Sequence, residues 1–229
     1  MQLENLMKVI RSRRTTRGFV ESELTDEQVE LLVEAARFAP CAINYQPWEF
    51  VVVREPENKR DIVDVWNRVR DEFQTAHPGY RIATKAYLQD AAALVMVLGD
   101  PRCDPRMGLQ DVIRSPDPRD YSWREYMFLL GIGASIENLL LTATAMGFGG
   151  GWLTTDIMGM EDEMKRVLGV PEPIRLVSMV AIGIPGRKFP MPFKRDVEKL
   201  LHLEHYDAGR LRSDEDVVRE CKPGAARSR

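Results

Sequence analysis

The chain has 229 residues, of which 44% are hydrophobic and 29% are charged, a balance typical of one sizeable globular domain. Its net charge of -3 argues against a general nucleic-acid-binding protein, because binding to phosphates needs a basic surplus. The start has no signal-peptide pattern, and Glu137 and Asn138 interrupt the longest apolar stretch, so we expect a cytoplasmic protein without a membrane segment.

The first elements have clear sequence signals. Apolar residues recur on one helical face over residues 2–12, which predicts an amphipathic helix. Thr25 and Gln28 have the spacing of a capping box, so a second helix begins there, and it ends before Pro40. The β-branched run at 49–53 predicts a strand.

The middle of the chain continues with a helix over 57–74 and a buried strand over 91–99. Residues 100–120 are rich in proline, which favours a mobile loop or lid. Residues 121–151 then read as one long helix that is apolar nearly all round. We expect a partner subunit to cover part of this helix.

The last third contains a short helix at 161–168 with Gly169 as its C-cap, a third strand at 174–186, and a candidate helix at 194–206. The tail at 222–229 has a disordered composition. Strands scattered among many helices predict an α+β fold rather than a regular βαβ series.

Several common catalytic patterns are missing from the sequence. No GxGxxG follows a strand, and neither a P-loop nor a GxSxG elbow occurs. The three cysteines form no CxxC pair, which suits a reducing compartment, and the three histidines lack metal-binding spacing. We therefore expect no metal site.

Four segments together resemble the FMN-dependent nitroreductase family, in matching order over about residues 8–201. They are RSRRTTRGF (11–19), APCAINYQPWEFVVV (39–53), GASIENLLLTATAMGFGGGWLTT (133–155), and VAIGIPG (180–186) followed by FKRDVEKLL (193–201). The resemblance implies an α+β fold with a central mixed or antiparallel sheet flanked by helices. It also implies a homodimer with a long interface helix and two shared FMN sites.

The same resemblance suggests a domain plan. We expect a single FMN-binding domain over 1–206, with a lid-like insertion around 68–120. Residues 207–229 would form a partly disordered C-terminal extension.

The first matched segment implies a cofactor role for its basic cluster. Arg13 and Thr15 fall where the family contacts the phosphate and ribityl oxygens, with Arg14 beside them. Arg17 falls near the pyrimidine edge of the flavin, where a positive charge would stabilise the anionic reduced ring. The alternative is a solvated basic cluster after a helix.

Two further segments imply contacts from elsewhere in the dimer. Cys41, Ala42 and Asn44 match a loop that reaches the flavin held mainly by the partner chain. Cys41 stands where the family commonly has serine, and the alternative is a small packed thiol. Lys194 and Arg195 match a second phosphate clamp, with Arg195 as the main ligand. The alternatives are Lys194, if the register shifts by one residue, and a pair of residues on a helix surface.

The WLTT segment matches the turn that faces flavin N5. Thr154 and Thr155 would offer N5 a hydroxyl or a backbone N–H, and Thr154 and Arg17 are the catalytic candidates. The alternative is a pair of ordinary strand threonines. Glu137 stands where the family often has glutamine, and we interpret it as structural at the interface.

The implied reaction is hydride transfer from NAD(P)H to FMN, followed by reduction of a small electron-poor aromatic acceptor, nitroaromatic or quinone-like, in a ping-pong cycle. A second hypothesis is a reductive dehalogenase or other narrow-substrate enzyme, because TKAYLQDAAALVM (84–96) is similar to the iodotyrosine-deiodinase branch. Lys85 and Tyr80 would then bind substrate, whereas a solvated Lys85 is the alternative. A non-catalytic flavin-binding protein is the hypothesis from another class.

Overall fold

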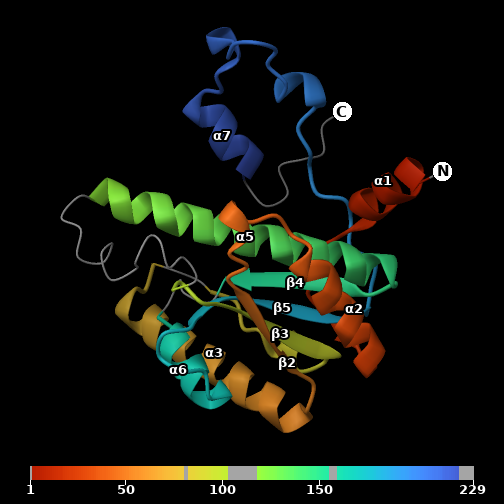
Figure 1. Ribbon diagram of the computed structural model, residues 1–229, viewed down its shortest axis with the longest axis vertical. Coiled ribbons are helices and arrows are strands. Elements are labelled where there is room, and N and C mark those ends of the chain that lie inside the picture. Colours follow the sequence, from red (N-terminus) through yellow and green to blue (C-terminus); the bar gives the residue numbers. More distant parts are fainter. Residues whose placement is uncertain (1, 80–81, 103–117, 155–158, 222–229) are drawn as a thin grey trace. The chain divides into compact units, whose positions relative to one another are not determined.

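The computed structural model describes residues 2–79, 82–102, 118–154 and 159–221, with only the backbone of 118–124 and 221 (Figure 1). The chain divides into two compact units, Met1–Lys188 and Phe189–Arg229. The expected tail at 222–229 and most of the expected lid loop, 103–117, lie outside the described residues. The expected division at residue 206 stays a prediction.

The first unit is built on an antiparallel sheet. Its strands are β1 (Phe19–Val20), β2 (Trp48–Val53), β3 (Ala93–Gly99), β4 (Gly149–Thr154) and β5 (Arg175–Pro185). The order is β1-β5-β3-β2, and β4 pairs with β5 as well. Every pairing between these strands is antiparallel. Because β3 and β5 each pair with a strand on both sides, they form the centre of the sheet.

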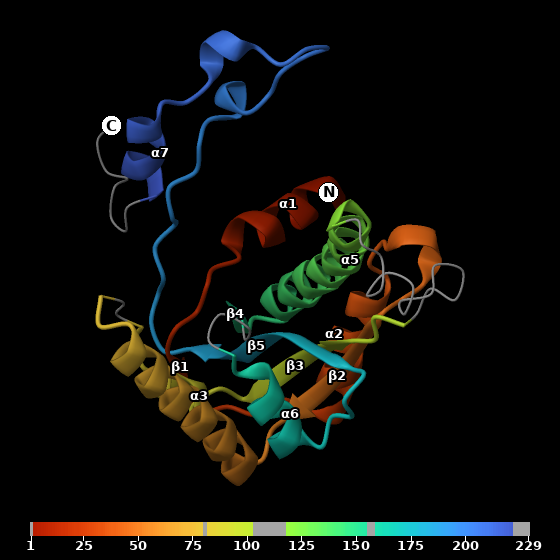
Figure 2. The ribbon, with the colours of Figure 1, turned by 90° about the vertical axis from the view of Figure 1, so that its left-hand side faces the viewer.

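Helices cover both faces of this sheet (Figures 1 and 2). The helices α3 (Pro56–Ala76) and α6 (Glu161–Leu168) lie on one face, while α2 (Asp26–Arg37) and α5 (Pro118–Ala145) lie on the other. The N-terminal helix α1 (Gln2–Ser12) contacts α5. The arrangement confirms the predicted α+β class.

The central strands are apolar throughout because they have a core on each side. In β3, Leu94 and Met96 belong to the core under α3 and α6, whereas Val95 and Val97 belong to the core under α2 and α5. Successive side chains of a strand point to opposite faces, so a strand buried on both faces needs no polar alternation.

The predicted helix ends are also confirmed. Gln28 N–H donates to Thr25 Oγ1 at 3.2 Å and Thr25 N–H donates to Gln28 Oε1 at 3.0 Å, which completes the capping box of α2. Gly169 ends α6 with a left-handed φ of 67°, a conformation that glycine adopts without steric cost.

Two predictions of secondary structure were wrong. The long helix expected to reach residue 151 ends at Ala145, and Gly149–Thr154 forms β4 instead. The expected helix at 194–206 is reduced to a 3-10 turn, Val197–Lys199, and among the described residues of the second unit an α-helix forms only later, as α7 (Asp214–Cys221). Glu204 has a positive φ of 59° and Asp207 N–H donates to His202 Nδ1, so the chain turns there.

Candidate functional site

The basic segment after α1 lies directly against β4. Thr15 forms a parallel bridge with Gly150, and Thr16 N–H donates to Gly150 O at 2.9 Å. A methyl group added at Gly151 would lie 2.6 Å from Thr16 O, and one added at Gly149 would collide with the Thr16 hydroxyl. The glycines of β4 therefore allow this close backbone approach.

A pocket of about 250 Å³ opens where this crossing meets α3 and the segment before β3. It brings together four predicted site residues from three separate stretches of sequence: Thr15, Arg17, Lys85 and Thr154. The remaining lining residues were not among the sequence candidates: Trp66, Ile82, Tyr87, Gly151, Trp152 and Leu153.

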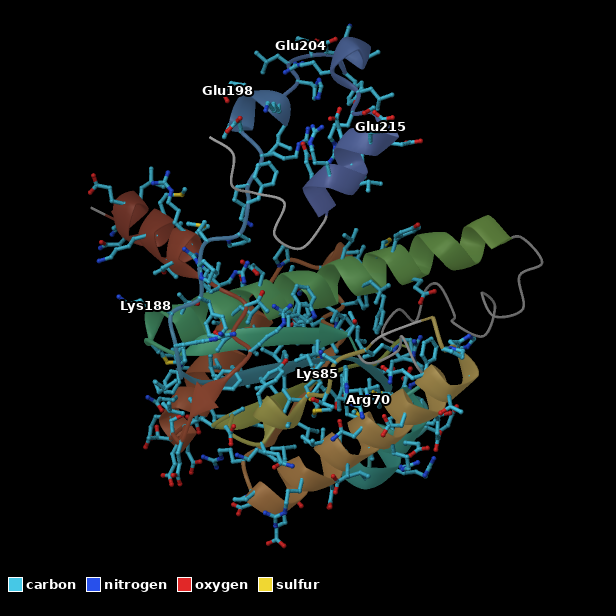
Figure 3. All side chains as sticks on the ribbon, turned by 180° about the vertical axis from the view of Figure 1, so that it is seen from behind. Arg70, Lys85, Lys188, Glu198, Glu204 and Glu215 are labelled. Atoms are coloured by element: carbon cyan, nitrogen blue, oxygen red, sulfur yellow. The ribbon has the colours of Figure 1, made fainter. Side chains whose placement is uncertain are left out.

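The charge of this pocket is positive. Lys85, labelled in Figure 3, has its Nζ 5.6 Å from the ring centroid of Trp66, close enough for a cation–π interaction. Burial, and then the charge of Arg17, lower the pKa of Lys85 below its usual value. No carboxylate within the described parts of the chain forms an ion pair with Lys85 or Arg17, so the pocket suits an anionic group.

Tyr87 is half-buried at the same pocket. Burial raises the pKa of its phenol, and the nearby charge of Arg17 opposes that rise. Its ring centroid lies 6.2 Å from that of Phe19, which packs it against the core. Tyr87 could have been predicted as a lining residue because it lies two residues after Lys85. The sequence pattern indicated Trp66 only as a core residue of α3.

Arg13 and Arg14 lie outside the lining of this pocket. Arg13 Nε is 3.3 Å from Glu137 Oε1 of α5, so Glu137 has a cationic partner. Arg14 Nη1 donates to the carbonyl oxygens of Arg11 at 2.6 Å and of Arg13 at 2.8 Å. Among the described residues the Nη atoms of Arg13 donate no hydrogen bond, which leaves that edge of its guanidinium available to an oxyanion.

The loop with Cys41, Ala42 and Asn44 lies against α5 rather than at the pocket. A methyl group at Gly131 would lie 3.1 Å from Cys41 Cβ. Ile43, Asn44 and Gln46 have positive φ angles of 48°, 57° and 47°, a conformation that asparagine tolerates but that is strained for the β-branched Ile43. Gln46 N–H donates to Cys41 Sγ at 3.3 Å, so the thiol accepts the bond that a serine hydroxyl would accept.

The remaining candidates lie elsewhere. Tyr80 and Thr155 are outside the described residues. Lys194 and Arg195 belong to the second unit, where Lys194 is exposed and Arg195 Nη2 donates to Lys199 O at 2.9 Å. Arg195 Nε also lies 3.7 Å from Glu220 Oε2 of α7.

The described ranges hold no group of three or more histidine, cysteine or acidic side chains that could bind a metal ion. Glu125–Ala145 of α5 is long and apolar enough to cross a membrane by length and composition, a test that core helices also pass. Its packing on α2 and β4 is that of a core helix.

Comparisons with known proteins agree with this architecture. The sequence matches the nitroreductase family over residues 10–184. A putative NADH dehydrogenase/NAD(P)H nitroreductase from Archaeoglobus fulgidus is 30% identical over 186 residues, covering 80% of this chain and 87% of that protein. Iodotyrosine deiodinase 1 from Mus musculus is 23% identical over 202 residues, covering 84% of this chain and 66% of that protein.

A solved structure has the same fold. The crystal structure of a BluB-like flavoprotein from Clostridium difficile 630 has a TM-score of 0.74 at 24% identity, covering 87% of this chain and 99% of that one. The fold and the family match together define an oxidoreductase of a flavin-dependent class. The chain belongs to the nitroreductase family.

Proposed function

We propose that this chain is an FMN-dependent oxidoreductase that uses NAD(P)H to reduce an electron-poor aromatic acceptor, nitroaromatic or quinone-like, in a ping-pong cycle. The observation that carries the proposal is the pocket where Thr15, Arg17, Lys85 and Thr154 meet in a chain of the nitroreductase family. We further propose that the enzyme works in the cytoplasm as a homodimer.

The residues present fit a flavin mononucleotide. Arg17 and Lys85 place positive charge at the pocket without carboxylate partners in the described structure, as a ring that becomes anionic on reduction requires. The glycines of β4 let the backbone at Thr16 pack directly on the strand, which places Thr15 and Arg17 at the pocket. The Nη edge of Arg13 and the hydroxyl of Thr15 are donors suited to phosphate and ribityl oxygens.

Each residue then has a distinct proposed task. Arg13, with Arg14 beside it, would bind the phosphate, and Lys194 or Arg195 would form a second clamp. Arg17 would stabilise negative charge on the ring, and Thr154 or Thr155 would donate a hydrogen bond to it. Bound FMN supplies the redox chemistry, by accepting hydride from NAD(P)H and giving electrons to the acceptor.

Cys41, Ala42 and Asn44 would serve the site of the partner subunit. Their loop does not line the pocket of its own chain, and its backbone is held in a strained form against α5. A loop that is fixed in this way on a helix expected at the interface is suited to reach a cofactor in a second copy.

A second candidate function is reductive dehalogenation or another narrow-substrate reduction. It is favoured by the position of Lys85 in the lining of the pocket and by the match to the mouse deiodinase. Lys85 would then bind the acid group of an aromatic substrate, with Tyr80 as its proposed partner.

The visible absorption spectrum of the freshly purified protein tests the proposed function. We expect the bands of oxidised flavin, release of FMN on denaturation, and bleaching by NADH or NADPH that an added quinone reverses. A colourless protein that takes up no added FMN would contradict the proposal. A protein that holds FMN without bleaching would instead support the non-catalytic flavin-binding hypothesis.

A further inference from the structure

We propose that Trp152 is an aromatic wall of the acceptor pocket and that Ser178 is the positioning residue that holds it. The pocket would thereby select planar aromatic acceptors over compact inorganic ones. This inference rests on the proposed function and adds a specificity determinant to it.

Trp152 combines exposure with a fixed orientation. It lines the pocket between Gly151 and Thr154, and 43% of its surface is exposed, so part of the indole is open to a ligand. Its indole Nε1–H donates to Ser178 Oγ at 2.6 Å. An exposed indole that a hydrogen bond holds in one orientation is suited to stack on a flat ligand, because little side-chain entropy remains to be lost on binding.

Ser178 has no other evident reason to be polar. It is 2% exposed in β5, a strand in which the neighbouring buried residues are apolar. Burying a hydroxyl costs free energy unless it is hydrogen-bonded, and alanine would fill this position without that cost. Ser178 O–H donates to Leu153 O at 2.6 Å and its Oγ accepts from Trp152, so both of its bonds serve the strand segment that lines the pocket.

The rest of the pocket fits the same class of ligand. Trp66 and Tyr87 add further aromatic surface, and Arg17 and Lys85 supply positive charge. Electron-poor rings such as nitrobenzene stack favourably on an electron-rich indole. An octahedral acceptor such as ferricyanide gains nothing from a flat wall, so comparing the two acceptors isolates the role of Trp152.

Steady-state kinetics with nitrobenzene and with ferricyanide tests the proposal in the FMN-loaded protein. We expect Ser178→Ala to raise the KM for nitrobenzene by about fivefold, the effect of losing one hydrogen bond that orients the ring, with a smaller change in kcat. The KM for ferricyanide should not rise in parallel. Equal changes for both acceptors, or no change for either, would overturn the inference.

Ser135→Ala is the matched control. Ser135 is also fully buried and donates to a backbone carbonyl, Ile132 O at 2.8 Å, but it holds no aromatic side chain. Its loss should lower the melting temperature to a similar degree without altering the ratio of the two KM values. A shift of that ratio in Ser135→Ala would show that general destabilisation, not Trp152, is responsible.

A double-mutant cycle adds a second readout. Trp152→Phe keeps a ring but removes the N–H, so Ser178→Ala should have little further effect on the nitrobenzene KM in that background. Fully additive effects would contradict the positioning role. Wild-type protein that binds no flavin or does not turn over would refute the proposed function itself, whereas an active wild type with unaffected variants would refute only this inference.

Discussion

At the scale of single residues, Arg13 and Cys41 represent two proposed contacts to FMN, one made within the chain and one made to the site of the partner subunit. We predict that Arg13→Ala weakens FMN binding by about 10- to 100-fold, because a charge-assisted bond to phosphate is lost. Cys41→Ser should change it by less than about threefold, because a serine oxygen can accept the Gln46 N–H as the thiol does. Equal FMN occupancy of the two purified variants, measured by absorbance, would contradict this assignment.

Lys85 gives a prediction with a pH dependence. Burial and Arg17 lower its pKa, so it loses its charge at a lower pH than an ordinary lysine. The KM for 4-nitrobenzoate should therefore be lowest below that pKa and should rise as the pH passes upward through it. The KM for nitrobenzene, which has no charge to pair, should not follow this rise.

The matching variants isolate the charge. Lys85→Gln should remove both the preference for 4-nitrobenzoate and its pH dependence. Arg60→Gln makes the same change of charge on the exposed surface of α3 and should leave both in place. If Arg60→Gln acts like Lys85→Gln, the general field of the protein rather than the pocket is responsible.

At the scale of elements, β4 was predicted wrongly as part of a helix. The candidate site depends on this strand, because the segment with Thr15 and Arg17 packs against it. Gly149, Gly150 and Gly151 have low strand propensity and follow a long apolar helix, so local pattern alone favoured an extension of that helix. The physical reason for glycine is tertiary: Thr16 and Leu140 lie where its Cβ atoms would be. No local signal reports such a contact.

Gly151 therefore yields a stability prediction. The Cβ of Gly151→Ala would meet the backbone oxygen of Thr16, which cannot rotate away, so we expect a loss of about 1–3 kcal/mol in the free energy of unfolding. Gly79→Ala is the control, because nothing lies within 4 Å of its added methyl, and its effect should stay within about 0.5 kcal/mol. Thermal or urea unfolding of the two variants measures the difference, and similar values would show that the crossing tolerates strain.

Elements with their own local signals were predictable. The capping box indicated the start of α2, apolar periodicity indicated α1 and α3, and a continuous apolar run indicated the central strand β3. Four candidates drawn from motifs, Thr15, Arg17, Lys85 and Thr154, line one pocket, and their roles stay predictions. Trp66 and Tyr87 join the pocket only through folding, and an aromatic residue of a buried helix face looks the same in sequence whether or not it borders a pocket.

At the scale of the whole molecule, the surface of α5 and the neighbouring loop carries exposed apolar side chains that a binding partner would bury. Tyr126 and Leu130 of α5 are 67% and 71% exposed, and Phe38 and Ile43 near the Cys41 loop are 69% and 54% exposed. Contact between Gly131 and Cys41 joins the helix to the loop. Exposed apolar residues gathered in this way mark an interaction surface, which a second copy of the chain would bury in the proposed homodimer.

Leu130→Lys tests this arrangement. A charge placed at the centre of an apolar interface would be desolvated without a partner, so we predict a monomer by sedimentation equilibrium at concentrations where the wild type is a dimer. FMN binding should fall in the same variant, because the Cys41 loop would no longer reach the site of another copy.

Val167→Lys, at a 45% exposed position of α6 on the opposite side of the sheet, should stay dimeric and keep its FMN. A Leu130→Lys dimer with full FMN occupancy would place the interface elsewhere, whereas a monomer that retains FMN would show that each chain holds its cofactor alone.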